Sequence, residues 1–273
     1  MLDKLIKYDL KAGGRIISVI YLFMLLCAVF VRITGMLSNA LDGFIGNAMG
    51  YLWMFTMFIM ILSVVAVCVV TLVLILLRYR NNLLRDEGYL MHTLPVSAVS
   101  LYFSKIITSL IFFIGDIAVI ILSFIISGIP AEFGFTWDSF VKMLTTFHYG
   151  AKEYGVNGTL YIIVIIVLFI ICLYESISQF FASINIGYSI SGKGVNRDLI
   201  SVAVYIATYI ILQVVMVFAI FATVFMHGFD VPETEMLNYT GLLLVITIIL
   251  MSVFSVIYST ISIKLMQKKL NLE

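Results

Sequence analysis

Apolar residues in this chain are gathered into six long runs, and most of the polar residues lie between those runs. Each run is long enough to cross a bilayer as a helix, which takes about 20 residues. No run alternates apolar and polar positions over ten residues, as the strands of a membrane β-barrel do. The predicted spans lie near residues 16–36, 51–77, 106–128, 159–186, 200–226 and 240–263. The pattern therefore predicts an all-α polytopic membrane protein in which residues 1–273 form a single transmembrane domain.

The composition agrees with a chain whose main solvent is lipid. Hydrophobic residues make up 63% of the sequence and charged residues 11%, whereas an ordinary soluble domain has about 45–50% and about 25%. So few charges cannot cover a water-exposed surface, which excludes a soluble enzyme, a disulfide-stabilised scaffold and a disordered chain. The formal net charge of +1 gives no electrostatic reason to expect nucleic acid as a partner.

Cationic residues are concentrated in alternate connections between the predicted spans. The N-terminal segment, the loops after the second and fourth spans and the C-terminal tail hold four, four, two and three lysines and arginines, 13 of the 16. The other three are Arg32, Lys142 and Lys152. Because cytosolic segments are enriched in Lys and Arg, this distribution predicts that both termini lie in the cytosol. All six spans fit one orientation, which supports their number independently of hydropathy.

The first twelve residues have the pattern of an amphipathic helix. One face carries Leu2, Leu5, Ile6 and Leu10, and the lysines at positions 4, 7 and 11 lie opposite or beside it. We expect such a helix to lie in the cytosolic headgroup region, with Gly13-Gly14 turning the chain into the first span. A frayed, positively charged lead-in without a mechanical role is the alternative.

The outer stretch between the third and fourth spans, residues 129–158, has two interpretations. Its middle is amphipathic, with apolar residues at positions 140, 143, 144 and 147, and predicts a short helix lying on the outer membrane surface. An ordinary aromatic loop at the membrane interface would have a similar composition.

The inner loop from Arg78 to Lys105 is unusual for a simple connector. Charged residues come first, a short helix-like run follows, and Leu94-Pro95 then breaks the chain before Ser97, a possible N-cap for the approach to the third span. A short helix on the membrane face that ends at a proline is suited to docking into a groove on another protein.

This loop resembles that of a known family. The matching residues are Asp86-Glu87-Gly88-Tyr89-Leu90, Thr93-Leu94-Pro95-Val96-Ser97 and Lys105, which opens the third span. A second similar element is Phe181-Ala182-Ser183-Ile184-Asn185-Ile186-Gly187, at the cytosolic end of the fourth span. Together with the six-span layout and the N-terminal interfacial helix, these elements resemble the permease subunits of type 2 ATP-binding-cassette (ABC) exporters. The loop motif covers about 28 residues, and only the layout extends over the whole chain.

The resemblance implies a function and a set of partners. In that family two permeases, identical or homologous, assemble with two cytosolic ABC ATPases, and a coupling helix in the first inner loop sits in a cleft of the ATPase. The implied coupling residues are Asp86, Glu87, Gly88, Tyr89, Leu90, Leu94 and Pro95. No cofactor would bind this chain, since ATP and magnesium belong to the partner, and the chain would not be an enzyme. The implied location is the plasma membrane of a bacterium.

One feature departs from the family pattern. Family members often carry a re-entrant outer segment between the fifth and sixth spans, whereas residues 227–239 are short here and the long outer segment precedes the fourth span. The departure leaves the substrate class open. A weakly charged pathway is compatible with outward movement of an amphipathic peptide, drug or lipid.

Residues 187–193, GYSISGK, match the first seven positions of the phosphate-loop pattern. The eighth residue is Gly194, where that pattern needs Ser or Thr for magnesium, and the segment follows a membrane helix where the pattern needs a buried strand. We therefore favour a flexible helix end over a nucleotide site. If ATP drives this protein, we expect the ATPase to be another chain.

Two acidic residues lie inside predicted spans. Asp116 lies about 16 Å into the third span, where a carboxylate costs about 2.5–3.5 kcal/mol. It is predicted either to line a substrate path or to form a structural hydrogen bond with Ser, Thr or Tyr, and we favour the structural role. Glu175 lies nearer the cytosolic side of the fourth span and could snorkel or pair with a loop cation.

Three classes of function are compatible with a polytopic membrane chain to different degrees. The inner loop favours the membrane subunit of an exporter. An intramembrane enzyme is disfavoured because Asp116 and Glu175 differ in depth and lack a Ser/Lys or histidine-rich partner. The three histidines are isolated in sequence, so no metal site is proposed. A non-transporting membrane partner, such as an immunity or sensor subunit of an export system, is the main alternative.

Overall fold

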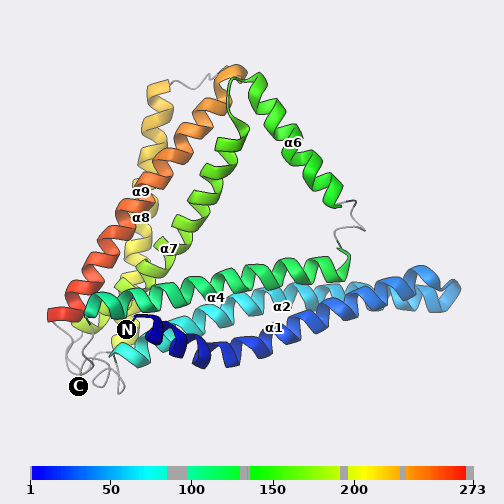
Figure 1. Ribbon diagram of the computed structural model, residues 1–273, viewed down its shortest axis with the longest axis horizontal. Helices are drawn as coiled ribbons and strands as arrows, with labels where there is room; N and C mark the ends of the chain where they lie inside the picture. Colours follow the sequence, from blue (N-terminus) through cyan, green and yellow to red (C-terminus); the bar gives the residue numbers. More distant parts are fainter. Residues whose placement is uncertain are drawn as a thin grey trace. The chain divides into compact units, whose positions relative to one another are not determined.

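The fold is all-α. The computed structural model describes residues 2–84, 97–129, 134, 136–190, 196–227 and 232–268, and it contains no strand within these ranges. The helices, coloured along the chain in Figure 1, are α1 (Leu2–Ala40), α2 (Gly43–Leu84), α4 (Ala98–Ser127), α6 (Trp137–Glu153), α7 (Gly158–Ile190), α8 (Arg197–His227) and α9 (Glu233–Lys268).

Six of these helices, all except α6, are long and apolar enough to cross a membrane. They correspond one to one to the six predicted spans, so the predicted fold class is confirmed. Except at the end of α4, which is one residue short of the predicted bound, the helices extend beyond the predicted bounds. Helix α2 has 42 residues, about 63 Å at 1.5 Å per residue. Hydropathy marks only the part of a helix that suits lipid, and a helix can continue into its polar flanks.

The outer segment between the third and fourth spans contains α6, so the loop interpretation is wrong for residues 137–153. Thr136 precedes the helix and its Oγ1 accepts a hydrogen bond from the Ser139 amide at 3.3 Å, which caps the helix start. Asp138 in the first turn and Lys152 in the last turn complement the helix dipole. Gly155, with a φ of 71°, ends the helix in the left-handed conformation that glycine permits. That α6 lies on the outer membrane surface stays a prediction.

Helix α1 runs unbroken through Gly13 and Gly14, so the predicted turn at these glycines is wrong. Gly13 serves packing instead: a Cβ there would lie 2.5 Å from Arg78 Nη1 and 2.7 Å from Phe112 Cζ. The predicted amphipathic pattern is confirmed, because Leu5 and Ile6 are half-buried and the three lysines at positions 4, 7 and 11 are exposed. Arg78 also donates to the Asp9 carbonyl at 2.8 Å, which ties the start of α1 to α2.

The chain forms two compact units. Unit 1 comprises Met1–Arg78 and Ile107–Phe140, and unit 2 comprises Tyr79–Ile106 and Val141–Glu273. Unit 1 has a core of Ala28, Val31 and Met60, against which Trp53 and Phe124 pack. In unit 2, α7 packs against both α8 and α9. The boundaries between the two units fall inside α2, α4 and α6. That residues 1–273 act as one permease domain stays a prediction.

The orientation can be tested by cysteine labelling. In a background without Cys27, Cys68 and Cys172, single cysteines at positions 138 and 235 should react with an impermeant thiol reagent in intact cells. Cysteines at positions 86 and 196 should react only after lysis. Asp138, Glu235 and Asn196 are exposed, so access is not limited by packing at these sites. The reverse pattern would overturn the orientation, and labelling at only one of positions 138 and 235 would overturn the number of spans.

Candidate functional site

The predicted coupling residues Asp86, Glu87, Gly88, Tyr89, Leu90, Leu94 and Pro95 lie outside the described residues. The structure does describe both flanks of this segment, which are the end of α2 at Leu84 and the start of α4 after Ser97. Both flanks belong to unit 2. The attachment of these flanks decides whether movement of the loop could reach the membrane helices.

The end of α2 is anchored by Tyr79. This side chain is 1% exposed and stacks on Phe181 of α7, with ring centroids 3.8 Å apart and planes inclined by 9°. Asn185 of α7 donates from Nδ2 to the Tyr79 hydroxyl oxygen at 2.7 Å. Leu83 and Leu84, the last residues of α2, are also buried. Phe181 and Asn185 both belong to the second element of the family resemblance. The end of α2 therefore packs against that element.

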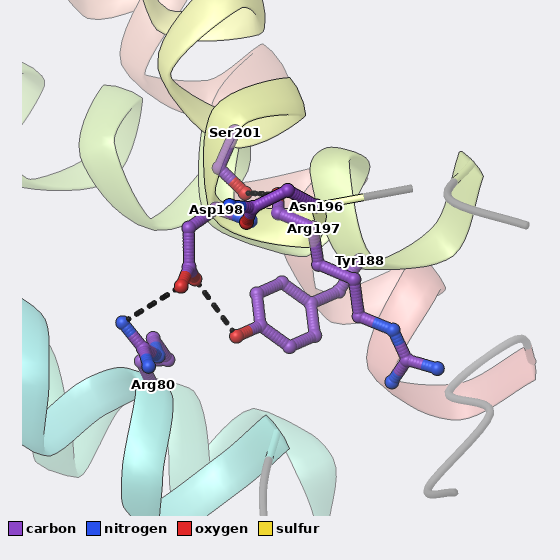
Figure 2. Close-up of polar contacts among 6 residues, drawn as sticks. All are labelled: Arg80, Tyr188, Asn196, Arg197, Asp198 and Ser201. Atoms are coloured by element: carbon purple, nitrogen blue, oxygen red, sulfur yellow. Dashed lines mark hydrogen bonds and ion pairs between the residues drawn. The ribbon is translucent and has the colours of Figure 1, made fainter. Parts of the chain in front are cut away.

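A polar cluster of Arg80, Tyr188 and Asp198 joins three helices, and Arg80 directly follows Tyr79 in the sequence (Figure 2). Arg80 Nη1 of α2 lies 3.1 Å from Asp198 Oδ2 at the start of α8. Tyr188, near the end of α7, donates its hydroxyl to Asp198 Oδ1 at 3.0 Å. Asn196 Oδ1 accepts the amide of Asp198 at 3.1 Å, which caps α8. Asp198 therefore contacts both the Arg80 guanidinium of α2 and the Tyr188 hydroxyl of α7. Its negative charge is also favoured by the helix dipole, because it lies at the N-terminus of α8.

The start of α4 is anchored in the same unit. Ser97 Oγ accepts the Ser100 amide at 3.3 Å, and this confirms the predicted N-cap. Leu101 and Tyr102 follow, and both are fully buried. Tyr102 donates to Ser259 Oγ of α9 at 3.2 Å and meets Phe181 edge-on at 6.2 Å between centroids. The rings of Tyr79 and Tyr102, one from each flank of the coupling segment, therefore share Phe181 as a packing partner.

The small residue at the end of the second resemblance element is also explained by packing. Gly187 lies within α7 against α8, and a Cβ there would lie 2.7 Å from both the Cα and the N of Ser201. Residues 187–190, the first part of the phosphate-loop-like string, are helical. A phosphate loop wraps its anion with the backbone of a loop between a strand and a helix. This part of the string therefore has helix-packing geometry and differs from a phosphate loop.

Asp116 lies in unit 1 and is 3% exposed. Its Oδ1 accepts the Tyr21 hydroxyl of α1 at 2.7 Å and the Thr71 hydroxyl of α2 at 3.0 Å. Its Oδ2 is buried, and no described residue hydrogen-bonds to it. One carboxylate oxygen thus links three helices, which is the geometry that the structural interpretation of Asp116 requires.

The role of Asp116 can be tested with two substitutions. Asp116→Asn keeps a side-chain oxygen that can accept from Tyr21 and Thr71, so we expect assembly and stability close to wild type. Asp116→Leu leaves both hydroxyls without this acceptor, and we expect a loss of about 1–2 kcal/mol, near the upper end for interhelical hydrogen bonds in membranes. Unfolding in mixed detergent micelles measures the free energy of unfolding of each variant relative to wild type.

The same variants separate structure from transport. Normal assembly of Asp116→Asn together with lost transport would show that ionisation serves the transport cycle. Full stability and activity of Asp116→Leu would remove Asp116 from either role.

Glu175 occupies the interior of unit 2 and is 3% exposed. It therefore does not snorkel, and no cation in the described part of the chain pairs with it. Its Oε1 is buried without a hydrogen-bond partner among the described residues. Within the same residues, no three His, Cys, Asp or Glu side chains gather closely enough to hold a metal ion.

Sequence reasoning did not identify Tyr79, Tyr102, Asp198 or the pairing of Arg80 as parts of this site. The available signal was their position, because each lies within a few residues of the predicted coupling loop or of a helix end. We name the group of Tyr79, Arg80, Tyr102, Phe181, Asn185, Tyr188 and Asp198 the anchor cluster.

Comparison of the chain with models of protein families, with curated proteins and with solved structures finds no match.

Proposed function

We propose that this protein is the membrane-spanning permease subunit of an ABC exporter of the type 2 family. It would work with a cytosolic ATPase and a second permease, identical or homologous, in a cell membrane with both its termini in the cytosol. The chain itself would carry no ATPase site, and ATP and magnesium would bind the partner. Its substrate would be an amphipathic peptide, drug or lipid moved outward. The six apolar helices and the resemblance of the inner loop support this proposal.

The observation that carries the proposal is the anchoring of both flanks of residues 85–96. The preceding flank is fixed by Tyr79 and Arg80, and the following flank by Tyr102. A loop that only connects two spans needs no such attachment. A loop that transmits force does, because its displacement is lost unless its ends are joined to rigid elements.

The anchor cluster suggests how displacement would be transmitted. When the ATPase pair closes, the docked segment would pull on the end of α2 and the start of α4. Phe181 contacts both tyrosines, so α7 would follow. Asp198 would carry the same movement to α8 through Arg80, and Ser259 would carry it to α9 through Tyr102. The membrane helices of unit 2 would then respond to a single cytosolic event.

Purification of the tagged chain from its native membrane tests the proposal. We expect an ATPase subunit to co-purify, and its ATP hydrolysis to rise when an amphipathic substrate is added. A stable complex without an ATPase would contradict the proposal and favour the non-transporting partner, such as an immunity or sensor subunit. Isolation from cells that lack the co-purified ATPase is the control for non-specific capture.

A further inference from the structure

Unit 1 contains a cavity of about 350 Å³ between α1, α2 and the end of α4. Polar groups from all three helices line it: Arg32 and Asn39 of α1, Trp53 of α2 and Ser127 of α4. The apolar side chains of Val31 and Met36 form another part of the cavity wall. Arg32 is the single charged residue among those that line the cavity, and no acidic residue is among them.

The Arg32 guanidinium lies against the backbone at the end of α4. Gly128 has a φ of 71°, and a Cβ at this position would overlap the Arg32 guanidinium. The absence of a side chain thus lets the guanidinium lie against the C-terminus of α4, where the helix dipole favours a cation. No hydrogen bond or ion pair joins Arg32 to another residue in the part of the chain that the structure describes. Its fixed fork of donors therefore stays available to a ligand.

The neighbouring groups favour an anion attached to an apolar chain. The Asn39 amide and the Trp53 indole N–H can donate beside the guanidinium, so the cavity offers a cation and neutral donors. Arginine forks bind phosphate in a bidentate manner. Met36 of the cavity wall is itself an exposed apolar side chain, so an acyl chain can contact it beside the polar groups. The cavity lies at the end of α4, one of the candidate membrane spans, so it is expected at the depth of lipid headgroups.

We propose that this cavity binds the anionic phosphate headgroup of a membrane lipid, with Arg32 as the principal contact. Asn39 and Trp53 complete the polar side of the site, and an acyl chain lies against the exposed side chain of Met36. The inference holds whether or not the chain works with an ATPase, because it rests on unit 1 alone.

Fluorescence of Trp53 provides a direct test. The chain has two tryptophans, Trp53 and Trp137, so Trp137→Phe leaves the cavity residue as the sole reporter. The full chain is placed in nanodiscs of phosphatidylcholine that contain a fixed fraction of either brominated phosphatidylglycerol or brominated phosphatidylcholine. Bromine quenches tryptophan on contact. We expect stronger quenching by the anionic lipid, and a fall of about tenfold in this preference in Arg32→Gln, because a charge-assisted contact to phosphate is lost.

Matched variants and a competitor complete the experiment. Lys142→Gln removes another exposed cation and should leave the lipid preference unchanged. Arg32→Lys keeps the charge and loses the fork, so an intermediate preference is expected even if Arg32→Gln fails to fold. If inorganic phosphate abolishes the preference, the site accepts the phosphate group from either source; if the preference persists, the lipid is the ligand. Equal quenching by the two lipids in wild type, or an unchanged preference in both Arg32 variants, would overturn the proposal.

Discussion

Replacing Leu90 and Leu94 together by aspartate is expected to leave the six spans in the membrane and to release the ATPase subunit. In the proposed complex these two side chains are apolar anchors in a cleft of the ATPase. Anchor residues of this kind typically contribute about 2 kcal/mol or more each, so loss of both should weaken binding by about a thousandfold. Membrane level, ATPase co-purification and substrate-stimulated hydrolysis, measured on the same preparation, check this result.

The matched control adds two negative charges to the same region without removing the anchors. Asn81 and Ser97 are exposed residues on either side of the predicted coupling segment. Asn81→Asp with Ser97→Asp should retain ATPase binding, and aspartate at position 97 can still cap α4. Normal binding and coupling in the leucine double variant would contradict the coupling role and favour the non-transporting partner.

Truncation of Phe181 to alanine should produce the largest loss of stability in unit 2. The ring is fully buried, stacks on Tyr79 and meets Tyr102 edge-on. Its removal leaves a cavity at the contact between both flanks of the coupling segment and α7, with an expected cost of about 3–5 kcal/mol. Unfolding of the purified chain by denaturing detergent measures the difference from wild type.

Phe169 on the same helix supplies the comparison for this substitution. It is 51% exposed, so Phe169→Ala should cost much less stability. Similar losses for the two variants would show that Phe181 has no special packing role. A Phe181→Leu variant that regains stability, but whose complex with the ATPase hydrolyses ATP without transport, would indicate that the aromatic contacts themselves serve coupling.

The six spanning helices could be predicted because lipid leaves a strong pattern in the sequence. The ends of α1, α2 and α9, which continue into polar flanks, could not be predicted in the same way. Leu83 and Leu84 extend α2 beyond the last residue of the long apolar run, through a stretch where charged and polar residues hide the helix from hydropathy. Gly13 illustrates the opposite error. Glycine often marks a turn, but here it admits Phe112 and Arg78, and this contact depends on the packing of three helices.

For polar residues inside the spans, the sequence predicts the depth of the residue but does not predict which residues it contacts. The sequence places Asp116 near the middle of a span, and hydropathy alone implies that it needs a partner. The partners Tyr21 and Thr71 lie 95 and 45 residues away. Helix rotation and neighbour identity decide such contacts, and no local pattern records them. For the same reason the resemblance identified Phe181 and Asn185 but not Tyr79, to which both bind.

The close approach of α7 and α8 at Gly187 has an evolutionary consequence. Any larger side chain would displace the Ser201 backbone, so selection for packing alone should fix glycine at this position in descendants of a common ancestor. Lys193 and Gly194 lie outside the described residues, and the contact between Gly187 and Ser201 does not involve them. Diverging sequences should therefore retain the first residue of GYSISGK and vary at its end, so that the likeness to a phosphate loop decays while the glycine persists.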